Sequence, residues 1–151
     1  MFRPIVMATA LSLASTSAGL AADLIEKTSP HSVSVTMDRL VAAVTGAGAT
    51  VFARVDHGAG ASSVELPLEP AELLIFGNPK LGTPAMQHGI TAGLDLPLRV
   101  LAYADSEGVV HVAYYDPAKL AKDHALPADA KYIQVMTGAL DKLTGKAVSA
   151  E

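Results

Sequence analysis

The stretch LRVLAYADSEGVVHVAYYD, residues 98 to 116, alternates apolar and polar positions on both sides of a short polar turn. Alternation with a period of two is typical of a strand that buries one face. The turn, Ser-Glu-Gly at 106–108, ends in a glycine that can take the positive φ needed to close a hairpin. The sequence therefore predicts a hairpin of two antiparallel strands, 98–105 and 109–116.

Three further segments are predicted as strands. AELLIFG at 71–77 is almost continuously apolar, as expected for a well-buried strand, and TVFARVD at 50–56 alternates again. HSVSVTM at 31–37 alternates serine and valine, which would place its two valines on one face of a strand. The intervening segment 57–70 is rich in Gly, Ser and Pro without a sustained period, so we expect a long loop there.

Apolar residues at helical spacing predict the helices. The first helix would begin after a cap at Thr36 and stop at Gly46, and two short helical segments follow at 78–89 and 117–122. A longer helix, 129–144, would end at a C-cap formed by Gly145. Its buried stripe is predicted to consist of Ile133, Met136, Leu140 and Leu143.

The first residues predict a secretory signal peptide. Residues 1–22 contain one basic residue, an apolar run from Pro4 to Leu13, and small residues before the charged Asp23. The apolar run is too short for a comfortable membrane span. We therefore expect cleavage just before or after Ala22, a periplasmic or secreted protein, and no stable membrane span once the signal is removed.

Composition limits the remaining possibilities. The 151 residues suit a single domain, here 23–151 with its core at 31–145, because a chain of this size buries roughly two-thirds of its unfolded surface. The absence of cysteine excludes disulfides and a thiol nucleophile. The net charge of −4, the scattered Lys and Arg residues and the lack of Trp argue against a nucleic-acid partner.

The corner GNPKLGTP superficially resembles a phosphate-binding loop. Gly77 and Gly82 have the required separation, but Thr83 follows where that motif needs lysine. Each of the two prolines in the corner follows a good N-cap residue, which is typical of a helix start, and each also removes one N–H donor. We interpret the stretch as a strand that turns into a short, twice-started helical segment.

Several blocks of the chain resemble the bacterial and archaeal family called domain of unknown function 302. The blocks are FARVDHGAGA, ELLIFGNPKLGTPAMQ, GLDLPLRVLAYAD and YYDPAKLAKDH, and the resemblance covers residues 31–145. It implies an α+β fold of β-α-β(4)-α type, similar to the TATA-box-binding-protein-like arrangement, with a curved antiparallel sheet packed against a long C-terminal helix. It also suggests a homodimer, and it transfers no activity.

Polar residues at strand ends and in connections are the candidate ligand-binding residues. An Asp beside a His can serve as an acid/base pair, although neighbours on an extended chain point to opposite sides. No two histidines stand one, three or four residues apart, so no local metal motif exists and no metal or cofactor is expected. The candidates are Asp56, His57, Asn78, Gln87, Asp95 and His124.

These observations favour an exported, non-catalytic domain that binds a small molecule, associates with its own copy, or does both. One alternative is a hydrolase- or isomerase-like enzyme that uses His57 or His124 with a carboxylate. Another is a purely structural homodimer that pairs through the outer sheet face, near Tyr103 and Tyr115.

Overall fold

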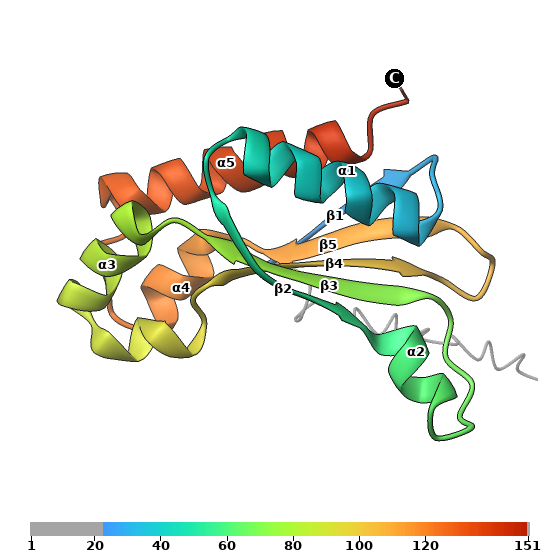
Figure 1. The fold of residues 1–151 in the computed structure, drawn as a ribbon. Coiled ribbons are helices and arrows are strands. Elements are labelled where there is room, and N and C mark those ends of the chain that lie inside the picture. The colour runs from blue at the N-terminus through green and yellow to red at the C-terminus, as the bar shows by residue number, and fades with distance from the viewer. Residues whose placement is uncertain (1–22, 151) are drawn as a thin grey trace, which may run out of the picture.

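The computed structural model describes residues 23–150, so the predicted signal peptide lies outside the described residues. The described chain forms a five-stranded antiparallel sheet in the order β1-β5-β4-β3-β2 (Figure 1). Two edge strands, β1 and β2, therefore flank three inner ones. The strands are β1 (Leu24–Ser29), β2 (Thr50–Asp56), β3 (Ala71–Gly77), β4 (Leu98–Ala104) and β5 (Val110–Tyr115).

Two long helices lie side by side over one face of this sheet (Figure 1). They are α1 (Val33–Gly46) and α5 (Lys131–Ala147). Shorter helices lie beyond the strand ends: α2 follows β2, while α3, η1 and α4 gather at the other end of the molecule. Their bounds are α2 (His57–Ser62), α3 (Pro79–His88), η1 (Ile90–Leu94) and α4 (Pro117–Asp123).

The buried side chains form two clusters that share α5. The first cluster joins α1 and the sheet to the second half of α5, and its members Met37, Leu74 and Leu140 are fully buried. The second joins α3, η1 and α4 to the first half of α5, where Ile133 and Met136 lie. The predicted buried stripe of the C-terminal helix is confirmed, because its residues supply both clusters.

The predicted strand at 31–37 is wrong. Ser32 is the N-cap of α1, and its side chain accepts a hydrogen bond from the Val35 amide, so HSVSVTM opens a helix instead. Val33 and Met37 are then buried one helical turn apart. The first strand is β1, which pairs with β5 along its whole length and begins before residue 31.

Other boundaries also differ from the sequence prediction. The expected loop 57–70 begins with α2, because Asp56 caps six residues that form a short helix. The corner at 78–89 gives one helix, α3, that starts at the Asn78 cap and continues through Pro84. The last helix passes through Gly145 to Ala147, so Gly145 is not a C-cap.

The α+β class and the hairpin are confirmed. Strands β4 and β5 pair antiparallel, and Gly108 takes a φ of 80° in the turn between them. The element order is strand, helix, four strands, helix, with the shorter helices inserted at the strand ends. The long C-terminal helix packs against α1, on the face of the sheet where α1 lies.

We predict that Gly89→Ala destabilises the fold by about 1–3 kcal/mol, because overpacking forces neighbours apart. A Cβ at Gly89 would lie 2.9 Å from both the His124 carbonyl oxygen and Leu126 Cδ2. Urea unfolding measures the change. Gly46→Ala is the matched control, since a Cβ there meets nothing within 4 Å. Equal stability of the two variants would show that the α3–α4 junction is not tightly packed.

Candidate functional site

An apolar cavity lies at the corner where β3 turns into α3. Its volume is about 190 Å³, and it opens between the sheet, α3 and the connection that leads to β4. Met136 brings α5 to its wall, and the ring of Phe52, which is 57% exposed, lies at its edge. The other apolar side chains that line it are Pro79, Leu81, Met86, Leu96, Pro97 and Leu98.

The corner itself is shaped by small residues and a cap. Asn78 lines the cavity, and its side chain accepts a hydrogen bond from the Lys80 amide at 2.9 Å, which starts α3. A Cβ at Gly77 would lie 3.4 Å from Pro97 Cβ and 3.6 Å from Phe52 Cε2. The glycine therefore leaves room for these two rings to approach the end of β3.

A polar cluster joins η1, α4 and β4 beside the second core. The His124 side chain is only 8% exposed, and its Nε2 lies 2.8 Å from Asp95 Oδ2. Its Nδ1 lies 3.0 Å from the Thr91 hydroxyl, and Arg99 donates to the other Asp95 oxygen at 2.7 Å. Because the Asp95 carboxylate can only accept, the imidazole donates from Nε2; the neutral imidazole then accepts the Thr91 proton at Nδ1.

Electrostatics keeps this carboxylate ionised. The hydrogen bond from His124 is the main influence that lowers the pKa of Asp95 below its usual value, and the charge of Arg99 adds to it. Asp95 also lines a second cavity of about 170 Å³ together with Arg99, Lys119 and Asp123. Lys119 and Asp123 form an ion pair with each other, so both signs of charge face this cavity.

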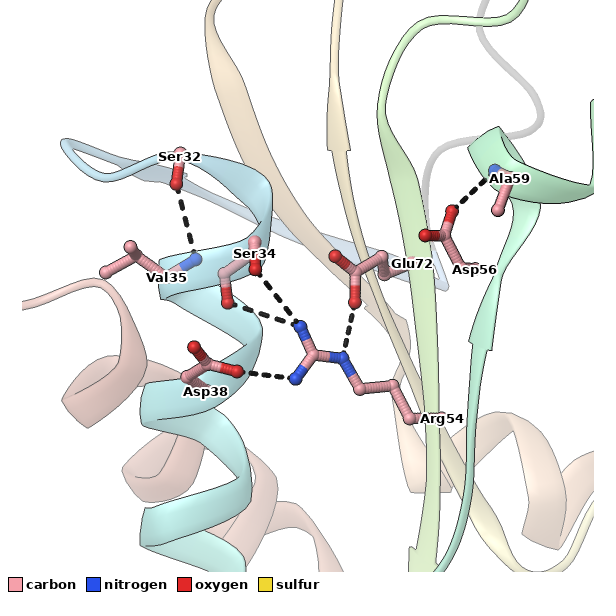
Figure 2. A network of polar contacts seen from close by, with 8 residues as sticks. All are labelled: Ser32, Ser34, Val35, Asp38, Arg54, Asp56, Ala59 and Glu72. Carbon is pink, nitrogen blue, oxygen red and sulfur yellow. Dashed lines mark hydrogen bonds and ion pairs between the residues drawn. The ribbon is translucent and has the colours of Figure 1, made fainter. Parts of the chain in front are cut away.

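A second polar network ties the sheet to α1 (Figure 2). Arg54 on β2 donates through Nε to Glu72 on β3 and through Nη1 to Asp38 on α1, the latter at 2.5 Å. The hydrogen bond with Glu72 is the main influence that raises the pKa of Arg54, so the guanidinium stays charged. Nη2 reaches the Ser34 carbonyl oxygen at 3.4 Å.

The structure distributes the six predicted ligand-binding residues over several places. Asp95 and His124 contact each other although they lie 29 residues apart in the chain. Asp56 caps α2 by accepting from the Ala59 amide at 2.8 Å, whereas the adjacent His57 lines a depression on the outer sheet face. Asn78 lines the corner cavity and Gln87 is exposed on α3.

Sequence reasoning missed several residues that complete these clusters. Thr91, Arg54 and Glu72 carry no local motif, because their partners come from other elements. The Arg54–Glu72 contact follows once the register is known, since Arg54 pairs with Leu74, two residues from Glu72 on the same face. Within residues 23–150, no three His, Asp or Glu side chains are grouped so that they could hold a metal ion.

Comparison with known proteins identifies the family. The model of the family described as "Domain of unknown function DUF302" matches residues 25–143, and the chain belongs to this family. A solved structure titled "Crystal structure of uncharacterized conserved protein DUF302 from Bacillus stearothermophilus" covers 84% of this chain and 99% of its own, with a TM-score of 0.75. At 16% sequence identity it shows the shared fold alone.

Curated relatives carry a different name. Proteins called "Fluoride-specific ion channel FluC 1" from Brucella suis biovar 1 (strain 1330) and Brucella abortus biovar 1 (strain 9-941) are 50% identical to this chain over 103 residues. The match covers 68% of this chain but only 41% and 38% of those relatives. None of the helices within residues 23–150 is long and apolar enough to cross a membrane.

The lowered pKa of Asp95 predicts an acid dependence of stability. A carboxyl whose folded pKa is lowered adds stability above its unfolded value of about 4, and that contribution disappears as pH falls through the folded pKa. Asp95→Asn should therefore make the loss of unfolding free energy between about pH 4 and pH 2 less steep than in the parent protein. Urea titrations across this range measure it.

Asp105→Asn is the comparison variant, because the hydrogen bond from His111 lowers the pKa of that carboxyl at a separate site. The two substitutions should act additively. If the unfolding free energy falls as steeply at acid pH in Asp95→Asn as in the parent protein, the contact with His124 does not stabilise the ionised Asp95 carboxylate.

Proposed function

We propose that this protein is a small, non-catalytic binding domain that holds a small, mainly apolar molecule in the corner cavity. The observation that carries the proposal is a preformed hollow between sheet, α3 and long helix, lined by apolar side chains with a few polar groups. Ligand sites commonly have this composition. Asn78, one of the predicted ligand-binding residues, is among the polar residues that line it.

The size of the cavity limits the ligand. Drug-sized ligands occupy roughly 300–1,000 Å³, and the corner cavity, at about 190 Å³, is smaller. An apolar cavity of roughly 150 Å³ engineered into another protein stays dry and takes up benzene. A molecule with one ring or a short branched chain therefore suits this site. Met86 and Met136 can adapt to its shape, because methionine is flexible and polarisable.

We do not assign to this chain the channel activity that appears in the names of the curated relatives. The shared part is less than half of those proteins. We infer that the fluoride channel in their names belongs to the part outside the match. The shared domain then acts as an accessory binding module. Export to the periplasm or beyond stays part of this proposal, on the strength of the predicted signal peptide.

Self-association is a second candidate role, supported by the sheet face opposite α1 and α5. Leu73, Leu101 and Ala113 line a depression of about 520 Å³ there, and the exposed ring of Tyr115 adjoins them. A partly exposed apolar surface beside charged residues is typical of an interface. A second copy that presents the same face would bury both patches at once, as in a twofold dimer.

The enzymatic alternative receives support from one contact. The bond between His124 Nε2 and Asp95 orients the imidazole, and its Nδ1 faces the Thr91 hydroxyl. His57 has no comparable carboxylate contact among the described hydrogen bonds, and it lies on the outer sheet face. His124 lines neither the corner cavity, nor the second cavity, nor the depression on the outer sheet face, so binding stays the preferred function.

The binding proposal predicts that Gly82→Leu blocks the cavity. Gly82 lines it, and a Cβ there would lie 3.8 Å from Leu96 Cδ1, so a leucine side chain would extend into the hollow. Toluene serves as the probe, and NMR chemical-shift titration of the Met86 and Met136 methyl groups reports its binding. We expect the variant to weaken toluene binding about tenfold or more.

Gly138→Leu is the matched control for this test. Gly138 is a glycine in α5 at which an added Cβ would meet nothing within 4 Å, so both variants gain similar helix propensity. Toluene affinity should stay at the parent value in Gly138→Leu. If the parent protein shows no saturable shifts at these methyl groups, or if both variants bind alike, the corner cavity is not the binding site.

The dimer proposal predicts that Leu101→Lys yields a monomer, because pairing of the two faces would remove water from the introduced charge. Sedimentation at micromolar concentration measures the mass. Val135→Lys is the control, since Val135 is 41% exposed and lies on α5, away from the outer face. A parent protein that sediments as a monomer would refute pairing through this surface.

A further inference from the structure

An irregularity in the edge strand β2 places one aromatic side chain at the corner cavity. Val51 pairs with Phe76 on β3. The next pair is Ala53 with Ile75, so Phe52 has no partner on that strand. Phe52 is thus the extra residue of a β-bulge, a feature that re-aims a side chain and is common beside functional sites. Its ring lines the corner cavity and is 57% exposed.

The bulge changes which residues of β2 face α1. In an uninterrupted strand, residues 52 and 54 would share one face, because side chains alternate. Arg54 faces α1, since it forms an ion pair with Asp38 on that helix. Phe52 would therefore enter the core beneath α1, where Val51 packs instead. With the extra residue inserted, Val51 and Arg54 both face α1, and the ring of Phe52 is left for the cavity.

The end of β3 fixes the position of this ring. Cε2 of Phe52 lies 3.6 Å from the point that a Cβ of Gly77 would occupy, so the ring rests on the backbone there. Pro97, which also lines the cavity, approaches the same point to 3.4 Å. The aromatic ring is therefore held at the rim, in contact with the wall on one side and with solvent on the other.

Two methionine side chains complete the part of the lining that can recognise a ring. Met136 is 1% exposed and belongs to the second core, whereas Met86 packs beside η1, where a Cβ at Gly93 would lie 3.3 Å from its sulfur. A thioether makes favourable contacts with an aromatic ring. A pair of aromatic rings likewise gains free energy beyond what the buried area supplies. The leucine side chains of the lining offer no such preference.

We propose that Phe52 determines the specificity of the corner cavity, by selecting a molecule with an aromatic ring over a saturated one of the same carbon skeleton. This inference rests on the binding function proposed above and names the chemical class of its ligand. The bound ring contacts the ring of Phe52 at the rim, and the thioethers of Met86 and Met136 line the space that it fills. A saturated molecule fills the same space but gains only the burial of apolar area.

The test compares toluene with methylcyclohexane, which has the same carbon skeleton without the aromatic ring. NMR chemical-shift titration of the Met86 and Met136 methyl groups in the mature chain measures both affinities. We expect Phe52→Leu to lower the ratio of toluene affinity to methylcyclohexane affinity about threefold to tenfold. Phe52→Tyr should keep the parent ratio, because the side chain is 57% exposed and the added hydroxyl can point to water.

Tyr115→Leu is the matched control. It removes a ring that is 60% exposed on β5 and does not line the corner cavity, so the ratio should match that of the parent protein. If Phe52→Leu keeps the parent ratio, or if Phe52→Tyr or Tyr115→Leu lowers it as much, Phe52 does not select the ligand, although the cavity still binds. If neither hydrocarbon gives saturable shifts in the parent protein, the binding function fails, and this inference fails with it.

Discussion

The fold depends on the packing of one helix against two separate groups of side chains. The second half of α5 completes the core that α1 forms with the sheet, through Leu140 and Leu143. Its first half, through Ile133 and Met136, completes the core that joins α3, η1 and α4. A helix of 17 residues, with its apolar stripe continuous from end to end, thus fixes the short helices to the strand ends.

This arrangement also explains where the hollows lie. The corner cavity is at the junction of the two cores, where Met136 and Leu98 meet the start of α3. A groove lined by Asp56, Glu69 and Glu72 is at the opposite end of β3, where the α1 N-terminus and α2 form the walls and no residue of α5 lines it. At that end Arg54 holds the elements together, because this residue of β2 forms ion pairs with β3 and α1. One end of the sheet is therefore closed by apolar packing and the other by ion pairs.

The sequence predicted the parts of this structure that follow from local chemistry. The hairpin, the strands at 50–56 and 71–77 and the stripe of α5 have strong periodicity and clear turn or cap residues. HSVSVTM was misassigned because its valines satisfy a period of two as well as the helical spacing that Ser32 initiates. The family resemblance supplied the curved sheet with its covering helix, which periodicity alone does not specify.

The candidate sites were harder to predict from the sequence, because they are formed by contacts across strands and between helices. Asp95 and His124 were singled out separately, but only the α4–η1 packing shows that they meet. The contact of Glu72 with Arg54 and its position opposite Asp56 follow only from the strand register. Conversely, the GNPKLGTP corner could be excluded as a phosphate loop from its residues alone, and it forms a strand-to-helix turn.

Strand β3 connects the groove at one end of the sheet to the corner cavity at the other. Glu72 and Gly77 mark the groove and the corner cavity on this one strand, five residues apart, which at about 3.3 Å per residue separates them by roughly 17 Å. That distance exceeds the range over which exposed charges interact at physiological salt, about 8 Å. A change of charge near Glu72 should thus leave the corner cavity unaffected, unless β3 itself shifts along its neighbours.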